Sequence, residues 1–90
     1  MTNETPDLTL YVRDYCMFCN RVMRTADELG VNLEIRNIWQ EPAFEKELVG
    51  ATGRATVPVL KINQAGAEAR WMPESSDIVQ YLQSGAGVSS

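Results

Sequence analysis

Apolar residues run together or alternate in short segments that predict β-strands. Residues 8–12, Leu-Thr-Leu-Tyr-Val, predict a buried first strand, and residues 31–38 predict a second. Residues 58–62 predict a third strand, followed by a turn at 63–66. Residues 67–72 predict a returning strand, although Ala-Glu-Ala-Arg suits a helix about as well. The inward positions of the second strand are expected to be Val31, Leu33, Ile35 and Ile38.

Other segments carry apolar residues at the spacing of amphipathic helices. Residues 17–29 predict a helix that ends at Gly30, with the apolar stripe Phe18, Val22, Met23, Ala26 and Leu29. Pro42 suits the first turn of a second helix, which ends near Gly50 or Gly53. Its core-facing positions are expected to be Phe44, Leu48 and Val49. Residues 73–76 begin the last helix, with the stripe Ile78, Val79, Tyr81 and Leu82.

The predicted order of elements is βαβαββα. Alternating βα units predict a parallel strand pair joined by a right-handed crossover, and the closing hairpin adds antiparallel strands. The sequence therefore predicts a single α/β domain over residues 1–90, with a small mixed sheet of four strands flanked by helices. The polar segment 1–7 and the Gly- and Ser-rich segment 84–90 are expected to be flexible.

Composition excludes several classes of function. With 8 basic and 12 acidic residues the net charge is −4, which argues against nucleic acid and against an anionic membrane surface. No apolar run approaches the roughly 20 residues of a membrane span, and residues 1–7 do not resemble a signal peptide, so a cytoplasmic location is expected. The absence of histidine removes Cys-His catalysis, and two cysteines cannot complete a zinc site within one chain, so no metal is expected.

The two cysteines, Cys16 and Cys19, follow the first predicted strand and open the first predicted helix. Unpaired N–H groups and the positive end of the helix dipole favour a thiolate there, which predicts a lowered pKa for the Cys16 thiol. Cys19 lies over the same first turn and can reach a disulfide formed at Cys16. This spacing beside a βαβ pattern is typical of a redox motif. Two alternatives remain: a buried pair without chemistry, and half of a metal or cluster site shared with a second chain.

Three segments resemble glutaredoxins. Residues 10–19, Leu-Tyr-Val-Arg-Asp-Tyr-Cys-Met-Phe-Cys, resemble the family's active-site segment, and residues 53–58, Gly-Arg-Ala-Thr-Val-Pro, resemble its Thr-Val-Pro signature. Residues 74–82 are similar to the Ser-Asp element before the last glutaredoxin helix. They are equally similar to the Glu-Ser element in the N-terminal domain of glutathione transferases. The resemblance covers residues 8–83 and implies a thioredoxin-like fold.

The resemblance also implies roles for individual residues. Cys16 would be the nucleophile, Cys19 the resolving thiol and Pro58 the family's cis-proline. The implied glutathione-binding residues are Arg13, Tyr15, Phe18, Arg54, Thr56, Val57, Pro58, Ser75, Ser76 and Asp77. The two arginines would approach the glycyl carboxylate, the Val57 backbone would pair with the cysteinyl unit, and residues 75–77 would receive the γ-glutamyl end. Each also has an ordinary structural explanation, such as a helix N-cap at Ser75 or Ser76.

The chain departs from the family pattern at two places. Met17 stands where dithiol glutaredoxins usually have proline, which restores an N–H donor near Cys16 and leads to the hypothesis of a stabilised thiolate. Residues 71–74, Trp-Met-Pro-Glu, replace the family's Gly-Gly and bring that end closer to the transferase pattern.

The function implied by the resemblance is a monomeric, glutathione-dependent thiol–disulfide oxidoreductase that reduces protein–glutathione mixed disulfides or protein disulfides. Glutathione is the expected co-substrate, with no tightly bound cofactor. The alternatives are a non-catalytic module that holds glutathione or an iron–sulfur cluster, and a domain like the N-terminal one of glutathione transferases.

Overall fold

The computed structural model describes residues 7–64 and 66–84. Within them the elements follow the predicted order, βαβαββα: β1 (Asp7–Val12), α1 (Met17–Leu29), β2 (Glu34–Asn37), α2 (Pro42–Thr52), β3 (Val59–Gln64), β4 (Ala67–Met72) and α3 (Ser75–Gln83). Segments 1–7 and 84–90, expected to be flexible, lie outside the described residues apart from Asp7 and Ser84.

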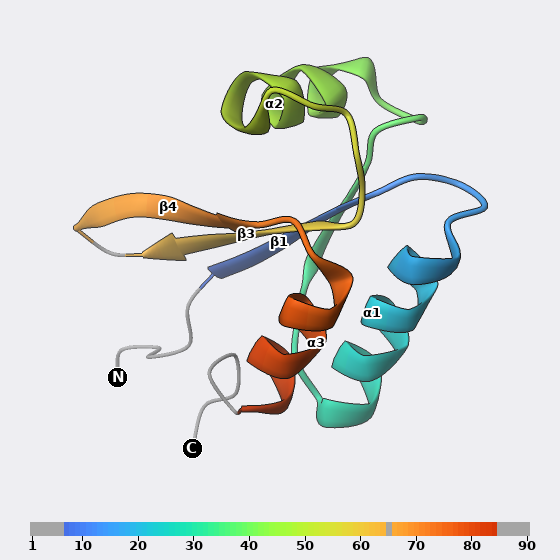
Figure 1. Ribbon diagram of the computed structural model, residues 1–90, viewed down its shortest axis with the longest axis vertical. Coiled ribbons are helices and arrows are strands. Elements are labelled where there is room, and N and C mark those ends of the chain that lie inside the picture. Colours follow the sequence, from blue (N-terminus) through green and yellow to red (C-terminus); the bar gives the residue numbers. More distant parts are fainter. Residues whose placement is uncertain (1–6, 65, 85–90) are drawn as a thin grey trace.

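The four strands form one mixed sheet in the order β2-β1-β3-β4. β1 and β2 are parallel, with Leu10 opposite Ile35, whereas β3 runs antiparallel to both β1 and β4. Helices α1 and α3 lie on one face of this sheet and α2 lies on the other (Figure 1). These directions place the carboxyl ends of β1, β2 and β4 at the same edge as the amino end of β3. Every loop that carries a predicted site residue therefore leaves the sheet at one edge.

The core is divided by the sheet, because successive side chains of a strand point to opposite faces. Leu10 and Leu60 belong to the larger cluster, which packs under α1 and α3. The smaller cluster lies under α2 and consists of Tyr11, Ile38, Leu48 and Val59.

Two predictions about the strands are corrected by the structure. The second strand is shorter than residues 31–38, and Ile35, expected to point inward, is 44% exposed. It does lie on the same face as Leu10, but β2 is an edge strand, so nothing packs beyond it. The helical alternative for residues 67–72 is wrong, because β4 pairs with β3 along this segment.

The helical stripes are narrower than predicted. In α1 the buried positions are Cys19, Val22 and Ala26, whereas Phe18 and Leu29 are exposed. Successive residues of an α-helix are rotated by about 100° about its axis. Phe18 and Leu29 therefore lie on the same side of the buried row Cys19, Val22 and Ala26, outside the face that packs on the core. In α2 Leu48 is buried but Val49 is 41% exposed, because only one line of this helix meets the sheet. This helix continues past Gly50 and ends with Gly53 in the left-handed conformation, at φ 78°.

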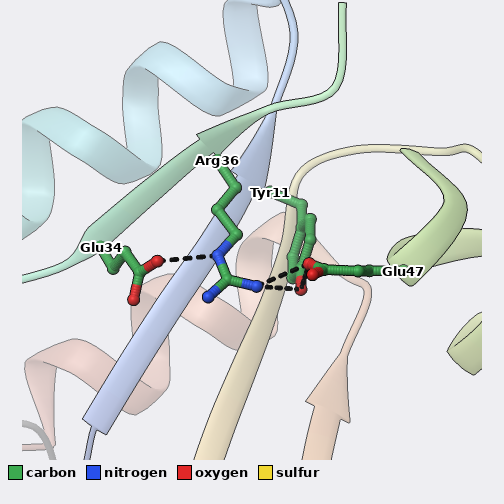
Figure 2. Close-up of polar contacts among 4 residues, drawn as sticks. All are labelled: Tyr11, Glu34, Arg36 and Glu47. Atoms are coloured by element: carbon green, nitrogen blue, oxygen red, sulfur yellow. Dashed lines mark hydrogen bonds and ion pairs between the residues drawn. The ribbon is translucent and has the colours of Figure 1, made fainter. Parts of the chain in front are cut away.

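A polar network fastens α2 to the sheet (Figure 2). The Tyr11 hydroxyl donates to Glu47 Oε1 at 2.9 Å, and Arg36 Nη1 donates to the same oxygen at 2.6 Å. Arg36 also donates from Nε to Glu34 Oε2 at 2.8 Å. The hydrogen bond from Tyr11, together with Arg36, lowers the pKa of Glu47, whereas burial and the Glu47 carboxylate raise the pKa of Tyr11.

We expect Glu47→Gln to destabilise the protein at pH 7 and to have little effect at pH 3. A carboxylate whose pKa is lower in the folded protein contributes stability above its unfolded pKa of about 4.3, and this contribution is lost as the pH falls through the folded value. The difference at pH 7 is expected to be below about 1 kcal/mol, because the pair is partly exposed to solvent. Urea unfolding of both proteins at the two pH values measures it. Tyr11→Phe keeps the carboxylate but removes the hydrogen bond that contributes most to lowering its pKa, so the stability lost between pH 7 and pH 3 should be smaller than in the wild type. An equal Glu47→Gln effect at both pH values would contradict the prediction.

Candidate redox-active site

Cys16 lies at the junction between the first loop and α1. It is the N-cap residue of the helix, with an extended backbone at φ −107° and ψ 107°, and its Sγ accepts a hydrogen bond from the N–H of Cys19 at 3.2 Å. A sulfur in this position faces the positive end of the helix dipole. The helix N-terminus therefore favours negative charge on Cys16 in the reduced protein.

Cys16 and Cys19 form a disulfide across the first turn of α1, with their Cα atoms 5.2 Å apart. Cys19 is completely buried, whereas Cys16 is 5% exposed. Of the two cysteines, Cys16 is therefore the one nearer to solvent.

Three large exposed side chains stand next to the cysteines in the sequence. Tyr15 is 94% exposed, and Met17 and Phe18 are exposed as well. Tyr15 has φ 58°, a left-handed backbone conformation that is uncommon for an aromatic residue. The backbone therefore turns sharply just before Cys16, and this turn leaves the Tyr15 side chain pointing away from the protein.

The segment before β3 reaches the same edge of the sheet as Cys16 (Figure 1). Its Val57–Pro58 peptide bond is cis, the isomer that the resemblance implied. Pro58 is buried, and Val57 packs against both core clusters. Arg54 and Thr56 are exposed.

The start of α3 is the third segment at this edge. Glu74 is the N-cap residue and α3 begins with Ser75, so the interpretation of Ser75 or Ser76 as the N-cap is wrong. Ser75 is half-buried, whereas Ser76 and Asp77 are exposed. The three segments thus share one edge, but no side-chain hydrogen bond or ion pair between described residues joins one to another.

Three of the predicted glutathione contacts line two separate clefts. Arg13 and Tyr15 line an open cleft of about 630 Å3 beside β2 and α2. Asp77 lines another, of about 470 Å3, together with Arg70 and Trp71. The assignment of these residues to glutathione stays a prediction.

The loop between β2 and α2 also reaches the cysteine-bearing loop, which the sequence analysis did not predict. Asn37 and Gln40 donate to the carboxylate of Asp14, and Trp39 lies against Arg13. The sequence contained a signal for this contact. Two parallel strands joined by a crossover end at the same edge of the sheet. A polar residue at the end of the second strand, here Asn37, therefore lies near the loop that follows the first strand.

Two further features describe the part of the chain that the structure covers. No three His, Cys, Asp or Glu side chains there form a group that could hold a metal ion. No helix in residues 7–64 and 66–84 has the length and apolar character needed to cross a membrane.

A family model described as Glutaredoxin matches residues 8–66. The chain belongs to the glutaredoxin family. For a glutaredoxin-family chain with this fold and a Cys16–Cys19 pair, the family and the fold indicate a glutathione-related thiol redox function, and they support a thiol oxidoreductase in general terms. No curated protein sequence matches this glutaredoxin-family chain.

Solved structures of two kinds share its fold. Leishmania TDR1, a trimeric glutathione transferase, is 33% identical with a TM-score of 0.70, over 90% of this chain and 18% of TDR1. A buckwheat glutaredoxin in complex with glutathione is 24% identical with a TM-score of 0.65, over 92% of this chain and 74% of its own. Glutathione transferase Omega 2S of Trametes versicolor is 17% identical with a TM-score of 0.70, over 89% and 36%. The chain thus spans only a minor part of either transferase.

Proposed function

We propose that this protein is a glutathione-dependent thiol–disulfide oxidoreductase that reduces protein–glutathione mixed disulfides and protein disulfides. The observation that carries the proposal is the Cys16–Cys19 disulfide at the N-terminus of α1, in which Cys16 is 5% exposed and Cys19 is completely buried. The helix N-terminus supports activation of the Cys16 thiolate without an imidazole, and the sequence contains no histidine.

The proposed cycle uses thiol–disulfide exchange alone. The Cys16 thiolate attacks the glutathione sulfur of a mixed disulfide, and the substrate protein leaves as a thiolate that takes up a proton. Glutathione is then bound to Cys16 through a disulfide. The thiolate of a second glutathione attacks this disulfide at the bound glutathione sulfur, which yields oxidised glutathione and restores the Cys16 thiolate.

For a protein disulfide the proposed route includes Cys19. Cys16 attacks one sulfur of the substrate, and Cys19 then displaces the reduced substrate while forming the intramolecular disulfide. Two molecules of glutathione reduce that disulfide and leave as one molecule of oxidised glutathione. The two electrons therefore pass from glutathione through the cysteine pair to the substrate.

The proposed glutathione site combines the three segments at the edge of the sheet. Arg13 and Arg54 receive the glycyl carboxylate, and the Val57 backbone pairs with the cysteinyl unit. Residues 75–77 receive the γ-glutamyl end, while Tyr15, Phe18 and Thr56 form walls. Shared position at one edge of the sheet supports this arrangement. The proposal also assigns the protein to the cytoplasm, where glutathione keeps thiols reduced, and to a monomeric state.

Turnover of a glutathionylated peptide tests the proposal, with oxidised glutathione measured by coupling to glutathione reductase and NADPH. The matched control is the same peptide carrying cysteine in place of glutathione. We expect the glutathione mixed disulfide to react at least tenfold faster, because cysteine alone lacks the γ-glutamyl and glycyl units that the proposed site binds. Equal rates would contradict the glutathione site, and the absence of turnover would contradict the proposed oxidoreductase activity.

Transferase chemistry is the second candidate, because the chain is 33% identical to Leishmania TDR1. Conjugation of glutathione to a chloronitrobenzene without any turnover of the peptide would favour it.

A further inference from the structure

The loop that carries Cys16 is tied to the loop that follows β2. One carboxylate oxygen of Asp14, Oδ1, accepts hydrogen bonds from Asn37 Nδ2 at 3.0 Å and from Gln40 Nε2 at 3.4 Å. Asp14 and Asn37 are both half-buried. These bonds join two segments that are more than twenty residues apart in the sequence, and Asp14 stands two residues before Cys16.

Asn37 is the centre of this contact, because its side chain also shapes its own loop. Its Oδ1 accepts from the backbone N–H of Trp39 at 2.9 Å and of Gln40 at 3.2 Å. Its backbone carbonyl accepts from the N–H of Glu41 at 3.1 Å. The amide oxygen thus holds a turn while the amide nitrogen points to Asp14, so the donor is presented by a rigid segment.

A second contact joins the same two loops. The guanidinium carbon of Arg13 lies 5.1 Å from the ring centroid of Trp39, within cation–π range. Arg13 Nη1 also donates to the backbone carbonyl of Asp14 at 3.1 Å. Together the contacts hold both residues that precede Tyr15.

Tyr15 needs such support. Its φ of 58° is a strained conformation for a residue with a side chain. Its side chain is 94% exposed and has no hydrogen bond or ring contact with the described residues, so it does not hold the conformation itself. The restraint must come from its neighbours, which are the tethered Asp14 on one side and the helix N-cap Cys16 on the other.

We propose that Asn37 is a positioning residue for Cys16: through its hydrogen bond to Asp14 it holds Tyr15 in the left-handed conformation and keeps the Cys16 sulfur at the N-terminus of α1. There the sulfur accepts a hydrogen bond from the backbone N–H of Cys19. The proposal rests on the proposed function and deepens it, since it assigns part of the reactivity of the nucleophile to a residue at the end of β2. The charged groups lining the cleft beside Tyr15 are Arg13, Asp14 and Glu41.

Alkylation of Cys16 in the reduced full chain tests the proposal. Iodoacetamide modification is followed by mass spectrometry from pH 4 to pH 10, which gives the thiol pKa and the rate at pH 7. Asn37→Asp keeps an acceptor for the turn but places an oxygen opposite the Asp14 carboxylate. We expect alkylation at pH 7 to slow at least fivefold and the pKa of Cys16 to rise. Asn37→Ser adds no charge, and its hydroxyl ends one bond short of the position of the amide nitrogen, so it weakens the contact with Asp14 and should shift both the rate and the pKa in the same direction.

The double variant Asp14→Asn with Asn37→Asp provides the rescue. There an amide at position 14 donates to a carboxylate at position 37, so the hydrogen bond is restored with its direction reversed. We expect its rate and pKa to return to within twofold and 0.3 pH units of the wild type. Asp14→Asn alone measures the effect of losing the charge, and subtracting it isolates the coupling between the two positions.

Two outcomes would overturn the proposal: an Asn37→Asp or Asn37→Ser rate within twofold of the wild type, or a double variant no faster than Asn37→Asp. Glu47→Gln is the matched control, because it weakens a polar network on α2 without touching the loop of Cys16. It should leave alkylation unchanged. No glutathione enters these measurements, so failure of the peptide turnover assay and failure of the positioning role are distinguishable.

Discussion

Cys16→Ser is expected to abolish turnover of glutathione mixed disulfides, to below about a thousandth of the wild-type rate. A serine hydroxyl at the helix N-terminus does not ionise near neutral pH, and it cannot form the disulfide that holds glutathione between the two half-reactions. The buried position of Cys19 prevents it from taking over, because no incoming disulfide reaches it without local unfolding. Steady-state kinetics with the glutathionylated peptide measure the loss.

Cys19→Ser is the matched variant, since it removes the other sulfur of the same disulfide. Turnover of the glutathionylated peptide should remain within about tenfold of the wild type, because a second glutathione can release Cys16. Reduction of a protein disulfide should fall on the order of a hundredfold, since it loses an intramolecular step of high effective concentration. Activity retained in Cys16→Ser, or equal losses on both substrates in Cys19→Ser, would contradict the assigned roles.

Leu48→Ala is expected to cost about 3 kcal/mol of unfolding free energy. Leu48 is fully buried and joins α2 to the core cluster of Tyr11, Ile38 and Val59. Shortening it leaves a cavity between the helix and the sheet, and a protein of this size has only about 5–15 kcal/mol of stability in total. Urea unfolding at pH 7 measures the change.

Val49→Ala on the same helix is the control for Leu48→Ala. The apolar stripe predicts that both positions face the core, whereas the structure leaves Val49 41% exposed. The cost at Val49 should therefore be below about 1 kcal/mol. Comparable costs at the two positions would favour the stripe and contradict the orientation of α2.

The order of strands and helices was predictable because it depends on local periodicity. Residues 8–12 have the run of a buried strand, and they form the central strand β1. Gly30 ends the first helix as predicted, since its φ of 72° suits a residue without a side chain. The failures lie where burial depends on distant partners. Ile35 lies on the core-facing side of the sheet, but no helix covers it there. Phe18 lies to one side of the helix face through which α1 packs against the core.

The sequence by itself determined the chemistry of this protein: two cysteines at the start of a helix, no histidine to assist them, and a family pattern in three segments. The tertiary structure decided which of the two cysteines lies nearer to solvent and which distant residue supports it. Asn37, at the end of β2, meets Asp14 only because β1 and β2 are parallel and end at the same edge of the sheet. The place of a cysteine pair at the start of a helix depends on neighbouring residues and can be inferred from their spacing, whereas a hydrogen bond between distant segments exists only after the strands have paired.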